Sequence, residues 1–182
     1  MINNNFTGIF HQRRVDKSNR PTVRPEMTPI DWLLEAVAAI GLMTLFGFAI
    51  YYYAKLPETI PSHFNGAGQP DEYAAKATFW TLPGIAVFIY ALMSVIVLVP
   101  HKFNFTVQIT PTNALKQYAM AINLIRYLKA AIIWLFFYIS YSTIRVAAGA
   151  DSGLGAWFLP VVLGGIVGPV IIYVIMAHRQ KK

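Results

Sequence analysis

The sequence contains no cysteine, which excludes disulfide bonds and metal sites built on thiolates. Charged residues make up only 13% of the chain, and just 8 residues are acidic. Three signatures of catalysis are also missing: a nucleophile paired with a base, a glycine-rich phosphate loop and the zinc-binding HExxH motif. The absence of these motifs argues against an enzyme, and we expect no cofactor.

Instead, the chain has four long apolar runs, at residues 32–53, 79–99, 119–144 and 156–177. About 20 helical residues cross a hydrocarbon core of about 30 Å, so each run is long enough to span a bilayer. Hydrophobic residues make up 56% of the 182 residues. We predict an all-α integral membrane protein, with a single four-helix transmembrane domain at residues 29–182. Residues 1–28 are predicted to form a flexible basic tail.

Lysine and arginine gather before the first run, between the second and third runs and after the fourth. By the positive-inside rule, both termini and the second loop then face the cytoplasm. We expect a multi-pass protein of the bacterial inner membrane. The net charge of +7 is explained by this topology, so no nucleic-acid partner is expected. The tail would bind anionic lipid headgroups or dock a cytoplasmic partner.

Helix starts and charges can also be located within the spans. Thr28 can cap the first helix, with Pro29 in its first turn and Asp31 complementing the helix dipole. A charge inside a bilayer is costly unless it is paired or reaches the interface. We predict that Glu35 faces Arg126 across a helix–helix contact.

The third apolar run begins with a polar face. Asn123, Arg126 and Lys129 recur every three residues and so share one side of a helix. The alternative to pairing is that the two cations reach lipid headgroups. Residues 113–129 are predicted to run along the cytoplasmic interface before the chain enters the membrane. Glycines and prolines in the fourth run favour close helix packing and leave a homodimer open.

The loop of residues 56–76, LPETIPSHFNGAGQPDEYAAK, is the most distinctive polar segment. Gly66 and Gly68 allow a tight turn, and Asp71 is predicted to start a helix that runs through Lys76. The loop is predicted to lie at the outer face and to be ordered. Its candidate binding or structural residues are His63, Asn65, Gly68, Asp71 and Lys76.

Three roles are open for this outer loop. Its polar groups could bond to one another in a purely structural role, or they could recognise a ligand or peptide. The third role is a metal or catalytic site, with His63, Asp71 and Glu58 as the candidate ligands. The other histidines are predicted to lie on the opposite side of the membrane, and the spacing matches no standard ligand pattern.

The second loop has its own pattern, FNFTVQIT at residues 103–110. Alternating apolar residues predict a short strand or an extended interfacial segment. Thr110 followed by Pro111 is typical of a helix start. Asn104, Thr110 and Asn113 are the candidate polar residues of this cytoplasmic loop.

Both loops resemble those of the SdpI-type immunity proteins, a bacterial membrane family largely of unknown function. The outer-loop pattern LPxxIPxHFNxxGxPDxxxxK is matched by Leu56, Pro57, Ile60, Pro61, His63, Phe64, Asn65, Gly68, Pro70, Asp71 and Lys76. The pattern FNxPVxITxxNAxxQY is matched by Phe103, Asn104, Val107, Ile109, Thr110, Asn113, Ala114, Gln117 and Tyr118. The resemblance covers about residues 32–129.

This resemblance implies a protein that protects against a membrane-active peptide toxin and relays its presence to a cytoplasmic partner. Our leading hypothesis is a non-enzymatic protein that recognises a peptide toxin or envelope component through residues 56–76. The alternative is a membrane-embedded metal-dependent hydrolase centred on His63 and Asp71.

Overall fold

The computed structural model describes residues 19–180 and is built around four long helices. They are α1 (Pro29–Tyr53), α2 (Thr81–Ile96), α3 (Ala114–Ala147) and α4 (Phe158–Arg179). The short 3₁₀ segment η2 (Lys76–Trp80) runs directly into α2. All four helices, with η2 counted into the second, are long and apolar enough to cross a membrane. The predicted multi-pass four-helix membrane bundle is confirmed.

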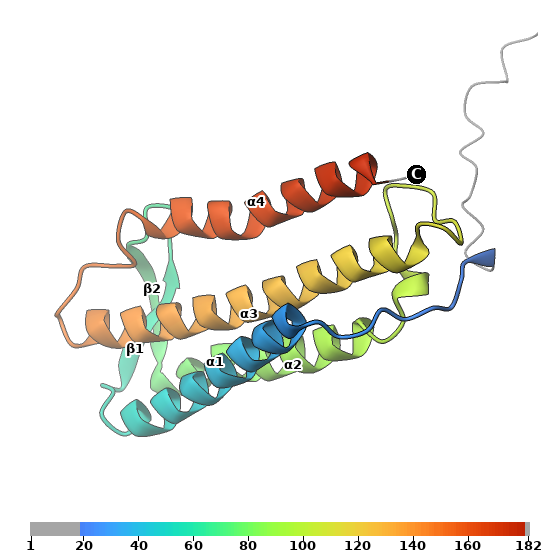
Figure 1. Cartoon of the computed structure of the whole chain (residues 1–182). Helices are drawn as coiled ribbons and strands as arrows, with labels where there is room; N and C mark the ends of the chain where they lie inside the picture. The colour runs from blue at the N-terminus through green and yellow to red at the C-terminus, as the bar shows by residue number, and fades with distance from the viewer. Residues whose placement is uncertain (1–18, 181–182) are drawn as a thin grey trace, which may run out of the picture.

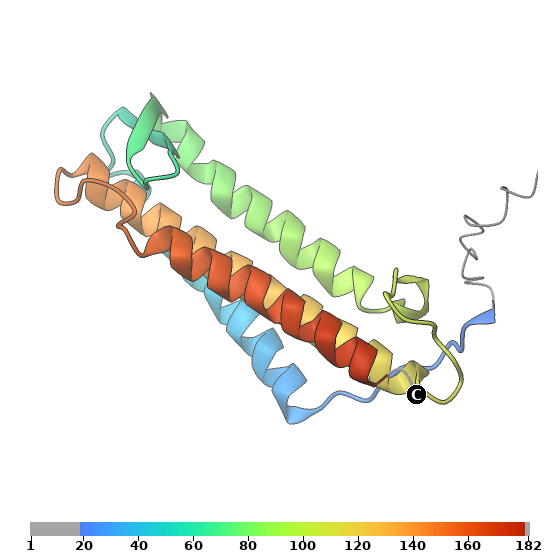
Figure 2. The ribbon, with the colours of Figure 1, turned by 90° about the horizontal axis from the view of Figure 1, so that it is seen from above.

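The third helix is the centre of the bundle. α3 contacts α1, α2 and α4, and Figures 1 and 2 show it running lengthwise between α4 and the other two helices. Its 34 residues form one continuous helix, about 51 Å long at 1.5 Å per residue. The helix therefore exceeds a hydrocarbon core of about 30 Å.

The outer surfaces of the helices are apolar and exposed. α4 is the extreme case, since none of the residues in its most apolar stretch is buried. Val161 and Ile172 are each more than half exposed. Such a surface is unsuitable for water but matches a hydrocarbon solvent, in which helices satisfy their own backbone hydrogen bonds.

The first helix starts as predicted. The hydroxyl of Thr28 accepts a hydrogen bond from the Asp31 backbone N–H, and the Asp31 carboxylate accepts one from the Thr28 backbone N–H. This reciprocal capping box fixes where α1 begins, with Pro29 in its first turn.

Between α1 and α2 the chain forms a β-hairpin at one end of the bundle, which we call the hairpin end (Figure 1). Its strands are β1 (Thr59–Phe64) and β2 (Pro70–Ala75), paired antiparallel from Thr59 opposite Ala75 to Phe64 opposite Pro70. The helix predicted from Asp71 to Lys76 is wrong. Strand pairing satisfies the backbone groups that a short helix would leave exposed, and β1 buries Ile60 completely.

Both described ends of the chain lie at the opposite end, which we call the tail end (Figures 1 and 2). The loop there contains a 3₁₀ turn, η3 (Pro100–Lys102), and residues 103–110 form no strand. Of the two predicted alternatives, a strand or an extended segment, the strand is therefore wrong, and Val107 and Ile109 bury their side chains against Tyr118. These contacts account for the apolar alternation without any partner strand.

The tail predicted to be flexible lies partly outside the described residues, at positions 1–18. Residues 19–28 contact the tail end of the bundle. Arg20 is buried and donates hydrogen bonds to the carbonyls of His101 and Phe103, at 3.3 and 2.6 Å. The hydroxyl of Tyr118 donates to the Pro21 carbonyl at 3.1 Å. These bonds hold the segment across the tail end of the bundle.

Candidate functional site

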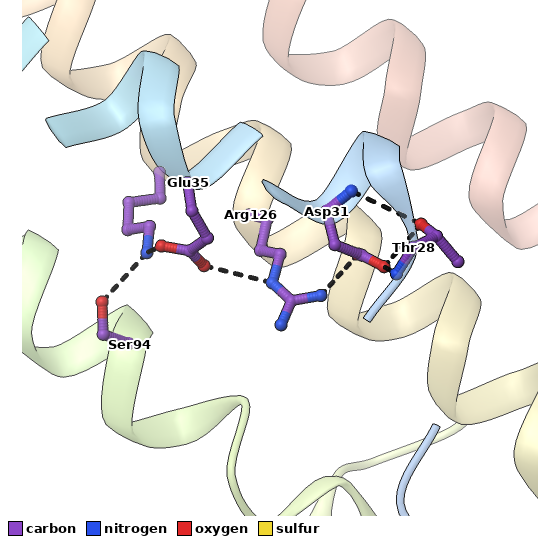
Figure 3. Close-up of polar contacts among 6 residues, drawn as sticks. Thr28, Asp31, Glu35, Ser94 and Arg126 are labelled. Carbon is purple, nitrogen blue, oxygen red and sulfur yellow. Dashed lines mark hydrogen bonds and ion pairs between the residues drawn. The ribbon is translucent and has the colours of Figure 1, made fainter. Parts of the chain in front are cut away.

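Four charged side chains meet in the tail-end half of the bundle, at the contact between α1 and α3 (Figure 3). Arg126 donates through Nη1 to Asp31 Oδ1, and through Nε to Glu35 Oε1 at 3.1 Å. The predicted contact between Glu35 and Arg126 is thus present in the structure. Asp31, assigned from sequence only to the helix start, also binds Arg126.

The second oxygen of Glu35 binds another cation. Its Oε2 lies 2.6 Å from Lys129 Nζ, and the same ammonium lies 2.9 Å from the Ser94 hydroxyl on α2. The Lys129 side chain is 1% exposed, so it does not reach the interface as a snorkelling lysine would. The cluster therefore connects α1, α2 and α3.

The cluster is electrically balanced, with two carboxylates against two cations. Removing one member would leave a buried charge without its partner, which is far more costly than the intact pairs are favourable. The arrangement fixes the relative rotation and height of three helices. We assign the cluster to the architecture of the bundle.

At the hairpin end, the turn between the strands is held by Asn65. Its side-chain oxygen accepts hydrogen bonds from the backbone N–H groups of Ala67 and Gln69, at 2.9 and 3.2 Å. Gly68 takes a φ of +76°, a conformation that favours glycine. Asn65 and Gly68 are thus turn-forming residues in this structure.

His63 and Asp71 contact each other across the hairpin, beside the position where His63 pairs with Glu72 in the strand register. His63 Nδ1 is 2.6 Å from Asp71 Oδ1, and both side chains are substantially exposed. The hydrogen bond and the charge of Asp71 raise the pKa of His63 above its ordinary value of 6.5. Protonated His63 and Asp71 then form a cross-strand ion pair.

The third candidate metal ligand points elsewhere. Glu58 Oε1 accepts from Lys76 Nζ at 2.8 Å, at the open end of the hairpin. Among residues 19–180, no three His, Cys, Asp or Glu side chains are grouped so that they could hold a metal ion. His63 and Asp71 are therefore paired with each other, and Glu58 forms a separate ion pair with Lys76.

The hairpin is docked onto the loop between α3 and α4. The backbone N–H of Leu154 donates to the Gly68 carbonyl at 2.7 Å. A side chain at Gly153 would collide with that same carbonyl, so this close approach requires glycine. Arg145 and Asp151 brace the loop with a bidentate ion pair at 2.8 and 3.0 Å. The hairpin therefore has a fixed position on the bundle.

The candidate residues of the tail-end loop differ in their hydrogen bonding and burial. Thr110 and Asn113 bond to each other reciprocally: the Thr110 N–H donates to the Asn113 side chain, and the Asn113 N–H to the Thr110 hydroxyl. Asn113 is buried, whereas Asn104 is exposed. Gln117 donates from α3 to the Ala177 carbonyl of α4 at 3.0 Å. Thr110 and Asn113 thus shape the entry to α3.

Sequence reasoning missed Asp31 as a partner of Arg126, Lys129 as a partner of Glu35, and the role of Leu154. A signal for the first two exists in the spacing. Asp31 and Glu35 are four residues apart on α1, and Arg126 and Lys129 are three apart on α3, so each pair shares one helix face. No comparable signal marks Leu154, because the contact uses only its backbone.

The comparisons with known proteins cover part of the chain. Residues 40–87, which include the end of α1, the hairpin and the start of α2, match a domain of unknown function, DUF1648. An uncharacterized protein of Archaeoglobus fulgidus is 30% identical over 67 residues, which are 37% of this chain. The chain spans 34% of the length of that relative. No solved structure matches the chain.

Proposed function

We propose that the hairpin of residues 59–75 is a recognition element that binds an extended peptide at the outer face of the membrane. Strand addition is a common way to bind peptides, since an unpaired strand edge offers a row of N–H and C=O groups. The observation that carries the proposal is the exposed edge of β2. In residues 19–180, β2 pairs with β1 alone, while β1 packs against the bundle.

The chemistry of this edge favours a polar or cationic peptide. Glu72 and Tyr73 are exposed on β2, and Tyr73 is 59% exposed. An acidic and aromatic edge can bind the side chains of a basic peptide, while its charge discourages pairing with a second copy of itself. The docking of Gly68 against Leu154 orders the edge in advance, which lowers the entropic cost of binding.

Two features support a peptide at the outer face. The tail end gathers most of the described lysine and arginine residues outside the spans, so the positive-inside rule directs the hairpin outward. The loop also resembles that of the SdpI-type immunity proteins, for which a peptide toxin is the implied ligand. Relay to a cytoplasmic partner would use α3, which contacts β1 and also carries Arg126 and Lys129.

The backbone of Ala75 provides the test. Lys76 donates its N–H to Glu58 across the hairpin at 2.9 Å, so the Ala75 N–H, one residue earlier, points away from β1. Ala75 has a φ of −57°, which proline adopts. Ala75→Pro therefore removes an outward donor and preserves the hairpin, whereas Ala75→Val retains the donor.

The experiment selects binders from a displayed peptide library, using wild-type protein in nanodiscs. Selected peptides should bind Ala75→Val with affinity close to that for wild type and bind Ala75→Pro about tenfold or more weakly. Peptides that bind both variants equally would exclude strand addition at β2. A killing assay with membrane-active peptides, using cells that express wild type or Ala75→Pro, then tests whether recognition confers protection.

A further inference from the structure

A small pocket of about 40 Å³ lies at the tail end, where the segment before α1 passes over α3. Much of its wall is polar or charged and consists of Arg24, Glu26, Thr28, Asp31, Asn123 and Arg126. The rest of the wall is apolar. Arg126 thus belongs both to the buried charge cluster and to the wall of this pocket.

The guanidinium of Arg126 has one nitrogen left over for a ligand. Its Nη1 and Nε bind Asp31 and Glu35, whereas its Nη2 has no hydrogen-bond partner in residues 19–180 and points away from both carboxylates (Figure 3). Arg126 is only 6% exposed. Nη2 is nevertheless not one of the unpartnered atoms that the protein encloses completely. It is therefore a free donor that a ligand can reach from the pocket.

The acidic groups near this donor are already engaged. Asp31 Oδ2 accepts hydrogen bonds from the Thr28 N–H and hydroxyl, at 2.7 and 2.6 Å, and its Oδ1 binds Arg126. Both oxygens of Glu35 bind cations. Arg24 and Glu26 also line the pocket, and their opposite charges offset each other. A free N–H of a buried cation beside occupied carboxylates favours an anionic oxygen as its acceptor.

The size and level of the pocket restrict the source of that oxygen. A water molecule needs about 10–15 Å³, so the pocket admits one or two oxygen atoms and not a whole phosphate ion. It lies at the start of α1, and Trp32 on the next turn is 64% exposed, as tryptophans at a membrane interface are. At this level of a bilayer, the oxygens that can enter from outside belong to lipid headgroups.

We propose that Arg126 binds a phosphate oxygen of an anionic phospholipid in the tail-end leaflet, with Arg24 and Asn123 as further donors at the same pocket. Arginine and phosphate form strong charge-assisted hydrogen bonds. The buried cluster would then be joined to the bilayer through its own arginine. The site is independent of the proposed peptide binding, which takes place at the opposite end of the bundle.

The test uses dioleoylphosphatidylglycerol as the probe, diluted into nanodiscs of dioleoylphosphatidylcholine. Native mass spectrometry of the released protein measures how far the probe is enriched over its share of the nanodisc lipid. Wild type should enrich it. Dioleoylglycerol, which has the same chains without the phosphate, should not be enriched. Inorganic phosphate at millimolar concentration should not displace the probe, because a free ion does not fit the pocket.

Ala119→Leu is the variant that blocks the pocket. Ala119 lines it, so a larger apolar side chain there fills the space and changes no charge. The variant should lose the enrichment. Its unfolding temperature in phosphatidylcholine alone, compared with that of wild type, separates a blocked site from a damaged fold.

Arg24→Gln tests the same site without changing its packing, since Arg24 is exposed. It should lower the enrichment about twofold to fivefold, the effect of one exposed charge pair. Lys116→Gln is the matched control, because Lys116 is an exposed cation near the start of α3 that does not line the pocket. It should enrich the probe as wild type does.

Three results would overturn the proposal. Enrichment that survives in a folded Ala119→Leu would show that the lipid does not use the pocket. Equal losses in Arg24→Gln and Lys116→Gln would leave only a diffuse attraction between the basic surface and anionic lipid. Displacement of the probe by inorganic phosphate would identify a site for a free anion and not for a lipid.

Discussion

Asp31 and Arg126 form an ion pair in which each side chain is less than one-tenth exposed. The two residues come from α1 and α3, and Asp31 also caps the helix that carries it. One carboxylate therefore fixes both the start of a helix and its attachment to the central helix. Such a residue should be among the least replaceable in the chain.

Arg126→Met should destabilise the protein by about 3–5 kcal/mol, because Asp31 would then be buried without a cation. Thermal unfolding in detergent measures the effect. Arg145→Met is the control: its pair with Asp151 is about two-fifths exposed, and removing it should cost about 0–1 kcal/mol. Equal losses from the two substitutions would contradict a stabilising role for the buried cluster.

Glu35→Gln and Arg126→Met should be strongly non-additive. Each substitution disrupts the same contact, so the double variant should lose less stability than the two single losses combined, by about 0.5–3 kcal/mol. A double-mutant cycle on the purified protein gives this coupling energy. Independent effects of the two substitutions would show that their contact contributes nothing.

The imidazole of His63 should titrate above pH 6.5, since Asp71 raises its pKa. The protonated form is the one that Asp71 binds. This contact therefore stabilises the hairpin fully below pH 6.5 and is lost as the pH rises through the raised pKa. NMR titration of the histidine resonances, assigned with His63→Gln, measures it. Asp71→Asn should return the pKa toward its ordinary value, and an unchanged pKa in that variant would exclude Asp71 as the cause.

Gly153→Ala should detach the hairpin from the α3–α4 loop, because the added methyl group collides with the Gly68 carbonyl. Hydrogen exchange at the Leu154 N–H should accelerate about tenfold or more, which corresponds to about 1.4 kcal/mol. Gly66→Ala is the control, since the space around Gly66 is open. Protection of Leu154 that survives in Gly153→Ala would contradict this docking.

Tyr118→Phe should loosen residues 19–28 by removing the hydrogen bond to Pro21. Trypsin should cleave after Arg20 and Arg24 about twofold to tenfold faster, in keeping with the net value of one hydrogen bond. Tyr127→Phe removes a similar bond, to Gly165 on α4, and should leave tail cleavage unchanged. If both variants are cleaved at the wild-type rate, the Tyr118 bond does not hold the tail.

Much of the fold can be predicted from the sequence, because a helix that crosses the hydrocarbon core must have a minimum length and be mostly apolar. The spans and the cap at Thr28 depend on local patterns of this kind. The sequence from Asp71 to Lys76 predicts a helix because its acidic start suits a helix cap equally well. Its pairing with β1 depends on residues about ten positions away, which local propensity does not describe.

In the candidate site, too, part of the arrangement can be predicted from the sequence and part cannot. The face shared by Arg126 and Lys129 can be read from their spacing, and so can their need for carboxylates. Which carboxylate binds which cation depends on how far α1 is shifted along α3, and that shift is set by packing.

The contact between Gly68 and Leu154 also orders events during biosynthesis. The ribosome makes Leu154 about 86 residues after Gly68, which takes roughly 4–17 s at ordinary elongation rates. For that interval the hairpin emerges without its docking partner. The nascent chain is therefore most vulnerable to proteases before the last helix is made, and chaperones or insertases that shield the undocked hairpin would raise the yield of folded protein.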